Sequence, residues 1–107
     1  MRACYFGGVR VIAVSTLKEF WGRPARGDAE MPLRAWVRIV EAAQWSNPTD
    51  IKAMFRSADI LPNGRVIFDI GGNKYRLVAA VHYRDGRIYV RFIGTHKNYD
   101  KIDARTV

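Results

Sequence analysis

The stretch RVIFDIGGNKYRLVAAVHYRDGRIYVRFIG (residues 65–94) decides the fold, because apolar and polar side chains alternate through it with a period of two. Three such runs, at 65–70, 73–83 and 87–94, are separated by a Gly-Gly and an Asp-Gly dipeptide. Both dipeptides are typical of two-residue hairpin turns. The stretch therefore predicts an antiparallel meander of three strands.

Turns of two residues would fix the pairing of the strands, and the pairing divides the side chains between two faces. Phe68 would then face Tyr75, and Tyr83 would face Ile88. The predicted apolar face holds Val66, Phe68, Tyr75, Leu77, Ala79, Val81, Tyr83, Ile88, Val90 and Phe92. The predicted polar face holds Lys74, Arg76, His82, Arg87, Tyr89 and Arg91. We therefore expect helices to cover the first face and to leave the second accessible.

The composition of the polar face favours a binding surface. Arginines beside an aromatic ring and a histidine suit a phosphate backbone and unstacked bases. Arg76 and Arg91 lie on neighbouring predicted strands, from which two guanidinium groups can hold one phosphate. The alternative is an ordinary solvated face, since half-exposed antiparallel sheets are polar on the outside in any case. An ordinary face usually mixes charges, whereas the sole acid on these strands is Asp69.

Upstream of the meander, the sequence predicts one further strand and three helical segments. The run VRVIAV (9–14) is short, apolar and rich in β-branched residues, which favours a strand. Helix start signals and helical spacing then mark segments near 15–23, 28–43 and 46–55. This order predicts an α+β fold, in which an N-terminal strand and the meander form a small, mostly antiparallel sheet. Two or three helices should pack on one face, and a short helix should end the chain.

Three local signals locate the starts of these helices. Thr16 and Glu19 have the spacing of a capping box, and Asp28 is a candidate cap for the second helix. Asn47 should cap the third helix, with Pro48 at its first position. The second helix carries an apolar stripe at helical spacing, made of Leu33, Trp36, Val37 and Val40. This stripe should face the sheet.

The length of 107 residues fits one domain, which we assign to residues 9–107 after an N-terminal extension of residues 1–8. The one cysteine, Cys4, allows no internal disulfide, and no zinc site or other cofactor is expected. The start MRACYFGG lacks the apolar core of a signal peptide, and no apolar run approaches the roughly 20 residues of a membrane helix. We expect a cytoplasmic protein that does not enter membranes.

The net charge of +8 is spread over the whole chain. Residues 1–55 carry eight Lys and Arg against five Asp and Glu, and residues 56–107 carry ten against five. The excess therefore belongs to the folded body and not to a basic tail. Such a body attracts polyanions, which include nucleic acids, acidic membrane surfaces and acidic proteins.

The segment FIGTHKNYDKID (92–103) adds groups that can transfer protons. His96 and Tyr99 are three residues apart, so they share one side of a short helix beside the polar face. A histidine, a phenol and fixed cations can cleave RNA by attack of the 2′-hydroxyl on the adjacent phosphorus. Residue types alone leave a second interpretation open, in which His96 is only a hydrogen-bonded surface residue at the end of a strand. His82, in mid-strand, fits a stacking or packing role better.

Several of these segments together are similar to a known family. VRVIAVSTLKEFW, AEMPLRAW, KAMFRSADIL, RVIFDIGGNKYRLVAAVHY and IYVRFIGTHKNYDKIDA resemble the HigB toxins of bacterial toxin–antitoxin pairs, within the RelE/ParE superfamily. The resemblance covers about residues 9–107, and its most specific part is FDIGGNKYRLV followed by GTHKxYDxIDA. It implies a helix-covered sheet with the active face on the other side. It also implies a metal-independent endoribonuclease that cuts translated messenger RNA, usually in the ribosomal A site.

The same resemblance implies partners and roles for particular residues. The partner would be a HigA-like helix-turn-helix antitoxin, which neutralises the toxin and represses their shared operon, so that operator DNA is bound only through the complex. The motif His96 and Tyr99 would be the acid and base, in either order, while Lys74, Arg76 and Arg91 hold the scissile phosphate. The further candidates for RNA binding are Arg56, Arg87, Tyr89, His82 and Lys97.

Two other functions remain open at this point. One is a ParE-like protein that inhibits DNA gyrase without cutting anything, and the other is a basic RNA-binding or ribosome-binding module without catalysis. The pair His96 and Tyr99 favours the nuclease, because a gyrase inhibitor has no need of it. One departure from the family pattern is the loop GRPARGD (22–28), which is longer and more basic than the resemblance leads us to expect.

Overall fold

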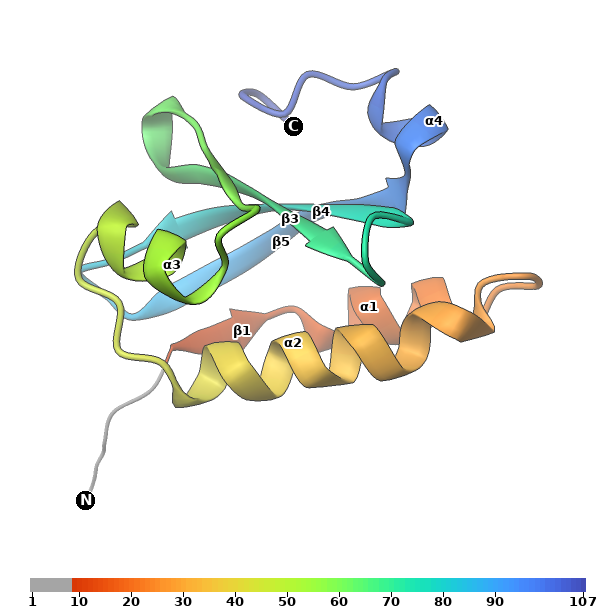
Figure 1. Cartoon of the computed structure of the whole chain (residues 1–107), viewed down its shortest axis with the longest axis horizontal. Helices are drawn as coiled ribbons and strands as arrows, with labels where there is room; N and C mark the ends of the chain where they lie inside the picture. Colours follow the sequence, from red (N-terminus) through yellow and green to blue (C-terminus); the bar gives the residue numbers. More distant parts are fainter. Residues whose placement is uncertain (1–8) are drawn as a thin grey trace.

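A computed structural model describes residues 9–107 of the chain, and the predicted extension 1–8 lies outside the described residues (Figure 1). Its five-stranded sheet has the order β1-β5-β4-β3-β2, with β1 parallel to β5 and all other pairs antiparallel. The strands are β1 (Arg10–Ile12), β2 (Asp59–Ile60), β3 (Arg65–Ile70), β4 (Tyr75–His82) and β5 (Arg87–Thr95). The predicted α+β fold with a mostly antiparallel sheet is confirmed, and the short edge strand β2 was not predicted.

Helices α1 (Val14–Trp21) and α2 (Glu30–Ala42) cover one face of this sheet (Figure 1), and α3 (Pro48–Met54) adds Ile51 to the same core. The remaining helical elements are α4 (His96–Tyr99) and the 3₁₀ turns η1 (Gly27–Ala29) and η2 (Pro62–Gly64). The predicted stripe of α2 buries Leu33, Trp36 and Val40 against the sheet. Since apolar residues at this spacing project from one side of a helix, the stripe fixes which side of α2 faces the core.

Of the three predicted helix caps, one is confirmed and two are wrong. The cap of α3 is confirmed, because the side chain of Asn47 accepts a hydrogen bond from the amide of Asp50 at 3.1 Å. The capping box at Thr16 is wrong, because α1 begins two residues earlier and encloses Thr16. Asp28 lies inside η1 and does not cap α2; its carboxylate binds Lys74 and Tyr75 instead.

The two hairpin turns are longer than predicted. Phe68 pairs with Leu77, so residues 71–74 connect β3 to β4, and residues 83–86 connect β4 to β5. The predicted turns of two residues, and the pairs drawn from them, are therefore wrong. In the first loop the amides of Asn73 and Lys74 both bond back to the carbonyl of Gly71, which closes a wider turn. Each register differs from the prediction by two residues, and an even shift keeps every side chain of these hairpins on its predicted face.

A β-bulge breaks this regularity in β5. Ala79 pairs with Val90 but Val78 pairs with Phe92, so Arg91 is an extra residue on the bulged strand. The bulge reverses the faces of the residues that follow it. The prediction that Phe92 joins the helix-covered core is therefore wrong, and its place beside that core is taken by Ile93.

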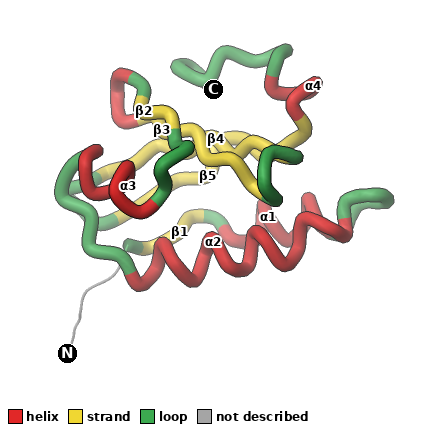
Figure 2. The backbone as a smooth tube through the Cα atoms, in the orientation of Figure 1, coloured by secondary structure: helices red, strands yellow, loops and turns green. Residues whose placement is uncertain are grey.

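A second apolar cluster lies on the face that was predicted to be polar. Ile67, Val78 and Ala104 are buried there, and Figures 1 and 2 show that α4 and the C-terminal segment lie on this side of the sheet, opposite α1 and α2. Phe92, Tyr99, Ile102 and Val107 pack against the cluster. The C-terminal segment thus covers the middle of the face that was predicted to be polar and accessible. The covering segment also holds α4 in place against the sheet.

Candidate functional site

The junction of β5 and α4 positions the predicted proton-transfer residues. Thr95 ends the strand and caps the helix, since its hydroxyl oxygen accepts a hydrogen bond from the amide of Asn98 at 3.2 Å. The observed register places Arg76 opposite Gly94, and Tyr75 opposite Thr95. The side chain of Arg76 comes beside the helix, because α4 folds back over β4.

Arg76 is the centre of the site and contacts three other side chains. Its Nε lies 3.5 Å from Nε2 of His96, and its guanidinium carbon lies 4.9 Å from the ring centroid of Tyr99. The same Nε is 3.8 Å from Oδ1 of Asp69, the residue that pairs with Arg76 on the neighbouring strand. Because this cation is half-buried beside a half-buried carboxylate, its position is more restrained than that of a surface arginine.

His96 has a second partner, which sequence reasoning missed. Its Nε2 lies 3.1 Å from the side-chain oxygen of Asn73, a residue of the β3–β4 loop. When Nε2 carries no proton it accepts from Nε of Arg76, and when it carries one it donates to Asn73. The nitrogen therefore has a hydrogen-bond partner whether or not it carries a proton.

The missed residues Asn73 and Asp69 share one cause. With a turn of two residues, Asp69 would face Lys74 and Asn73 would end the turn away from the helix. In the observed loop of four residues, Asp69 faces Arg76 and Asn73 reaches His96. An asparagine directly after Gly-Gly was the one signal in the sequence, since Asn is favoured in longer turns as well as in tight ones.

Lys74 was predicted to hold the scissile phosphate, and the structure places it in an ion pair. Its ammonium group donates to the carboxylate of Asp28, which also accepts a hydrogen bond from the Tyr75 hydroxyl. This contact ties the β3–β4 loop to η1. The hydrogen bond from Lys74, followed by the one from Tyr75, lowers the pKa of Asp28, and the same ion pair raises the pKa of Lys74. Burial, followed by the bond to Asp28, raises the pKa of Tyr75.

This tie predicts an acid-dependent part of the stability. Since the pKa of Asp28 lies below its ordinary value of 3.8, the unfolded chain binds this proton more readily than the folded one. The stabilisation is complete above that ordinary value and is lost as the pH falls through the lower pKa of the folded state. Asp28→Asn should therefore flatten the pH dependence of the thermal midpoint below about pH 4. Asp85→Asn, at an exposed carboxylate in the β4–β5 turn, is the control. Equal curves for wild type and Asp28→Asn would contradict the assignment.

Arg91 was predicted to hold the scissile phosphate with Arg76, while His82, Tyr89 and Arg87 were predicted to bind RNA. The contacts of these four residues lie apart from this centre. His82 packs edge-to-face on Tyr89 with ring centroids 5.0 Å apart, and the guanidinium of Arg91 lies 5.9 Å from the same Tyr89 ring. Arg87 begins β5, eight residues before Thr95, which corresponds to about 25 Å of strand. These four residues therefore form a separate group on β4 and β5.

The two remaining candidates flank the site at different distances. Lys97 is exposed on α4, directly after His96. Arg56 is exposed and follows α3, and Figure 1 places α3 and α4 toward opposite ends of the long axis. Within residues 9–107 no cluster of three His, Cys, Asp or Glu is arranged to hold a metal ion. The described helices include none long and apolar enough to cross a bilayer.

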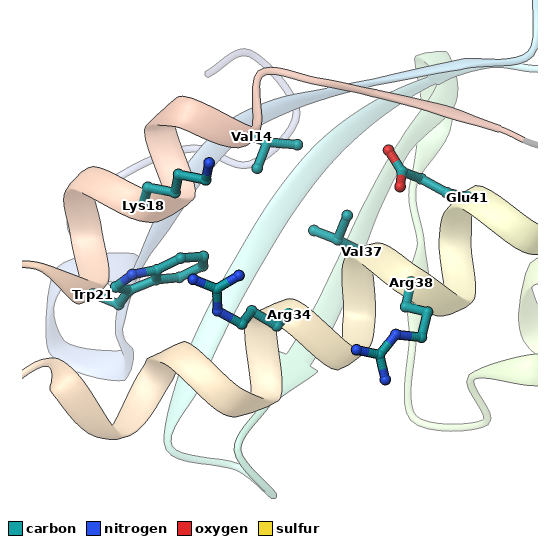
Figure 3. A pocket seen from close by; sticks show the side chains of 7 residues that line it. All are labelled: Val14, Lys18, Trp21, Arg34, Val37, Arg38 and Glu41. Atoms are coloured by element: carbon teal, nitrogen blue, oxygen red, sulfur yellow. The ribbon is translucent and has the colours of Figure 1, made fainter.

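A separate cleft lies between α1 and α2, on the helix side of the sheet (Figure 3). Its volume is about 250 Å³, and the guanidinium of Arg34 lies 4.9 Å from the ring centroid of Trp21 across it. Arg34 also donates to Glu30 at 2.8 Å. None of the site residues predicted from the sequence lines this cleft, which is therefore distinct from the centre around Arg76.

The fold and the site agree with one class of protein, the RelE-like toxic components of toxin–antitoxin systems. The model of the HigB toxin family, described as the RelE-like toxic component of a toxin–antitoxin system, matches residues 29–102. The chain therefore belongs to the HigB toxin family, and the resemblance seen in the sequence is confirmed.

Individual relatives carry a more specific name. A protein of Escherichia coli O6:H1 strain CFT073 named mRNA interferase HigB is 27% identical over 74 residues, which cover 67% of this chain and 72% of that protein. The mRNA interferase toxin HigB of Escherichia coli strain K12 is 36% identical over 62 residues, which cover 56% of this chain and 60% of that protein. A Shigella flexneri protein named mRNA interferase HigB matches with the same values. The match thus spans less than two thirds of the last two relatives.

Proposed function

We propose that this chain is the toxin of a toxin–antitoxin pair and acts as an endoribonuclease on messenger RNA. The observation that carries the proposal is the convergence of His96 and Tyr99 on Arg76, which brings an imidazole and a phenol ring to the same cation. The names of the relatives point to the same substrate. A toxin that inhibits gyrase by binding alone would not require these three groups to meet.

The proposed reaction is a transfer of the phosphoryl group within the RNA. The 2′-oxygen attacks the adjacent phosphorus in line, a new P–O2′ bond forms, and the bond from phosphorus to the 5′-oxygen breaks. The proton of the 2′-hydroxyl goes to one member of the pair His96 and Tyr99, and the other delivers a proton to the leaving 5′-oxygen. The products are a 2′,3′-cyclic phosphate and a 5′-hydroxyl. The reaction needs no oxidant and no second substrate.

Arg76 has the central electrostatic role in this proposal. Its guanidinium would bind a non-bridging phosphoryl oxygen, on which negative charge grows in the transition state. Asp69, with Oδ1 at 3.8 Å from Nε, would restrain the guanidinium. Asn73 would hold His96 in its protonated state. Sites of this kind act chiefly by having the donors in place before the charge develops.

The cations outside the centre would position the RNA strand and would take no part in the reaction itself. Arg91 and Tyr89 lie together along β5, with His82 and Arg87 beyond them, and this row would bind the strand as it leaves the centre. Lys74 would bind a phosphate only after its ammonium group has left the carboxylate of Asp28. Lys97 would face the RNA from α4, and Arg56 would contact RNA or a protein partner at the other end of the molecule.

The proposal includes partners and a compartment. Membership of a toxin family implies an antitoxin, which we take to be a HigA-like helix-turn-helix protein that neutralises the chain and binds the shared operator. The substrate would be translated messenger RNA in the A site of the ribosome. The toxin would therefore act in the cytoplasm. The net charge of +8 favours association with ribosomal and messenger RNA at low salt.

Primer extension on messages isolated during brief expression of the chain tests the proposal. We expect discrete cuts inside translated codons with wild type, and a loss of about 10²- to 10³-fold with Arg76→Ala. Arg38→Ala on exposed α2 removes the same charge and should cut as wild type does. Circular dichroism should confirm that both variants fold. Intact messages in cells whose growth has stopped would instead favour a gyrase inhibitor or a non-catalytic ribosome binder.

A further inference from the structure

A second basic hollow opens beside the proposed centre. It has a volume of about 570 Å³, and none of the residues that line it is acidic. Its rim carries Arg23 and Arg26 from the loop after α1, and its wall carries Phe92 and Ile93 of β5 with Asn98 of α4. The hollow exists because β1 pairs only with Arg87–Tyr89, which leaves the edge of β5 uncovered further along the strand.

The loop that supplies the two arginines is the basic insertion noted in the sequence. The match to the family model starts at residue 29, so Arg23 and Arg26 lie before the residues that it matches. Ala25 between them has a φ of 64°, a left-handed conformation that a residue with a side chain adopts at a cost. The loop therefore has a specific shape that sets the direction of both side chains.

Both guanidinium groups are available for an anion. That of Arg26 lies 6.0 Å from the ring centroid of Tyr75 and donates to the carbonyl of Ala25 at 3.2 Å, which leaves donors free. Arg23 has one acidic neighbour, Glu19, at 3.9 Å between exposed side chains. A contact of this length in water contributes little, so it does not compete strongly with a phosphate.

The hollow and the proposed centre adjoin through two neighbouring aromatic rings. The ring centroid of Phe92, in the wall of the hollow, lies 6.4 Å from that of Tyr99, and the guanidinium carbon of Arg76 lies 4.9 Å from the ring centroid of Tyr99. A single strand of RNA that presents one phosphate to Arg76 would therefore place a neighbouring nucleotide at the hollow. An apolar ring beside free arginines and an amide, Asn98, is the combination that binds unstacked nucleotides.

We propose that this hollow is a second nucleotide subsite for single-stranded RNA, in which Arg23 and Arg26 bind a phosphate next to the one that is cut and Phe92 packs against a base. The subsite rests on the proposed endoribonuclease function and adds to it a determinant that lies in the chain's own loop. An acidic segment of a partner protein is the other ligand such a hollow could take. We favour RNA over an acidic segment because the neighbouring rings of Phe92 and Tyr99 connect the hollow to the proposed reaction centre.

Binding of short RNA analogues to the purified chain tests the subsite. The probes are fluorescent 2′-O-methyl oligonucleotides of two and of five residues, which cannot be cut because the attacking hydroxyl is blocked. Arg26→Ala should weaken binding of the longer probe about tenfold, the size of one lost charge-assisted hydrogen bond. The slope of log affinity against log salt should fall by about 0.7 for each phosphate contact removed. Binding of the dinucleotide, with its single phosphate at Arg76, should not change.

Arg38→Ala is the matched control, since it removes one exposed positive charge outside the hollow. An equal loss of affinity in Arg38→Ala and Arg26→Ala would overturn the subsite, because net charge alone would then account for the binding. Unchanged RNA binding in Arg26→Ala together with weakened binding of the antitoxin would overturn it as well, and would assign the hollow to a protein partner.

The failure of the subsite and the failure of the proposed function can be told apart. If Arg76→Ala abolishes cleavage while Arg26→Ala binds the longer probe as wild type does, only the subsite is wrong. If Arg76→Ala and His96→Ala cleave as wild type does while Arg26→Ala loses affinity, the hollow binds RNA but the proposed reaction centre is wrong.

Discussion

Replacement of His96 by Ala is expected to lower the rate of RNA cleavage by about 10²- to 10⁴-fold, because one of the two proton-transfer groups is lost. Affinity for RNA should change little, since the phosphate is bound mainly by cations. The measurement is single-turnover cleavage of a defined message on programmed ribosomes, with binding of the 2′-O-methyl analogue measured in parallel. Lys101→Ala, at an exposed position beyond α4, is the control and should cleave at the wild-type rate.

The same assay can decide which member of the pair is the acid. A substrate with sulfur in place of the leaving 5′-oxygen needs no proton on the leaving group. The variant that has lost the acid should therefore cut this substrate nearly as fast as wild type does, while the variant that has lost the base should remain slow. Comparison of His96→Ala with Tyr99→Phe assigns both roles. Wild-type rates for both variants on the oxygen substrate would contradict the proposed centre.

Phe68→Ala is expected to lower the free energy of unfolding by about 3–5 kcal/mol, the usual cost of removing a fully buried phenyl ring. Phe68 is 1% exposed, and its ring contacts Trp36 at 5.3 Å, Phe55 at 5.1 Å and Trp45 at 6.3 Å between centroids. These rings come from α2, from the end of α3 and from the connection between them. The side chain therefore joins the helices to the sheet, and its loss leaves a cavity shared by three elements.

Urea unfolding measures this effect. Because the loss is comparable to the whole stability of many small domains, Phe68→Leu serves as a milder second variant with an expected cost of about 1–1.5 kcal/mol. Met31→Ala, at a side chain that is 74% exposed on α2, should stay within about 0.5 kcal/mol of wild type. A loss below about 1 kcal/mol in Phe68→Ala would mean that the aromatic cluster does not hold the layers together.

The elements that could be predicted from the sequence are those whose signals are local. The period of two in residues 65–94 identified β3, β4 and β5, the apolar stripe identified α2, and the motif of Asn47 and Pro48 identified the start of α3. The division of the hairpin side chains between two faces also held as far as the bulge in β5, because the error in each turn was an even number of residues. His96 and Tyr99 could be selected by residue type and spacing alone.

What only the tertiary structure decided depends on contacts between distant segments. The bulge at Arg91 moved Phe92 to the other face, the C-terminal segment covered Ile67 and Val78, and Asp28 bound Lys74 across 46 residues of sequence. Turn length, bulges and long-range ion pairs are chosen by the packing of whole layers, and small differences in packing free energy leave no periodic trace in the sequence. The sequence by itself therefore determined four of the five strands, the main helices and the candidate groups for proton transfer. The packing of the C-terminal segment and the β3–β4 loop determined that Arg76, His96 and Asn73 meet.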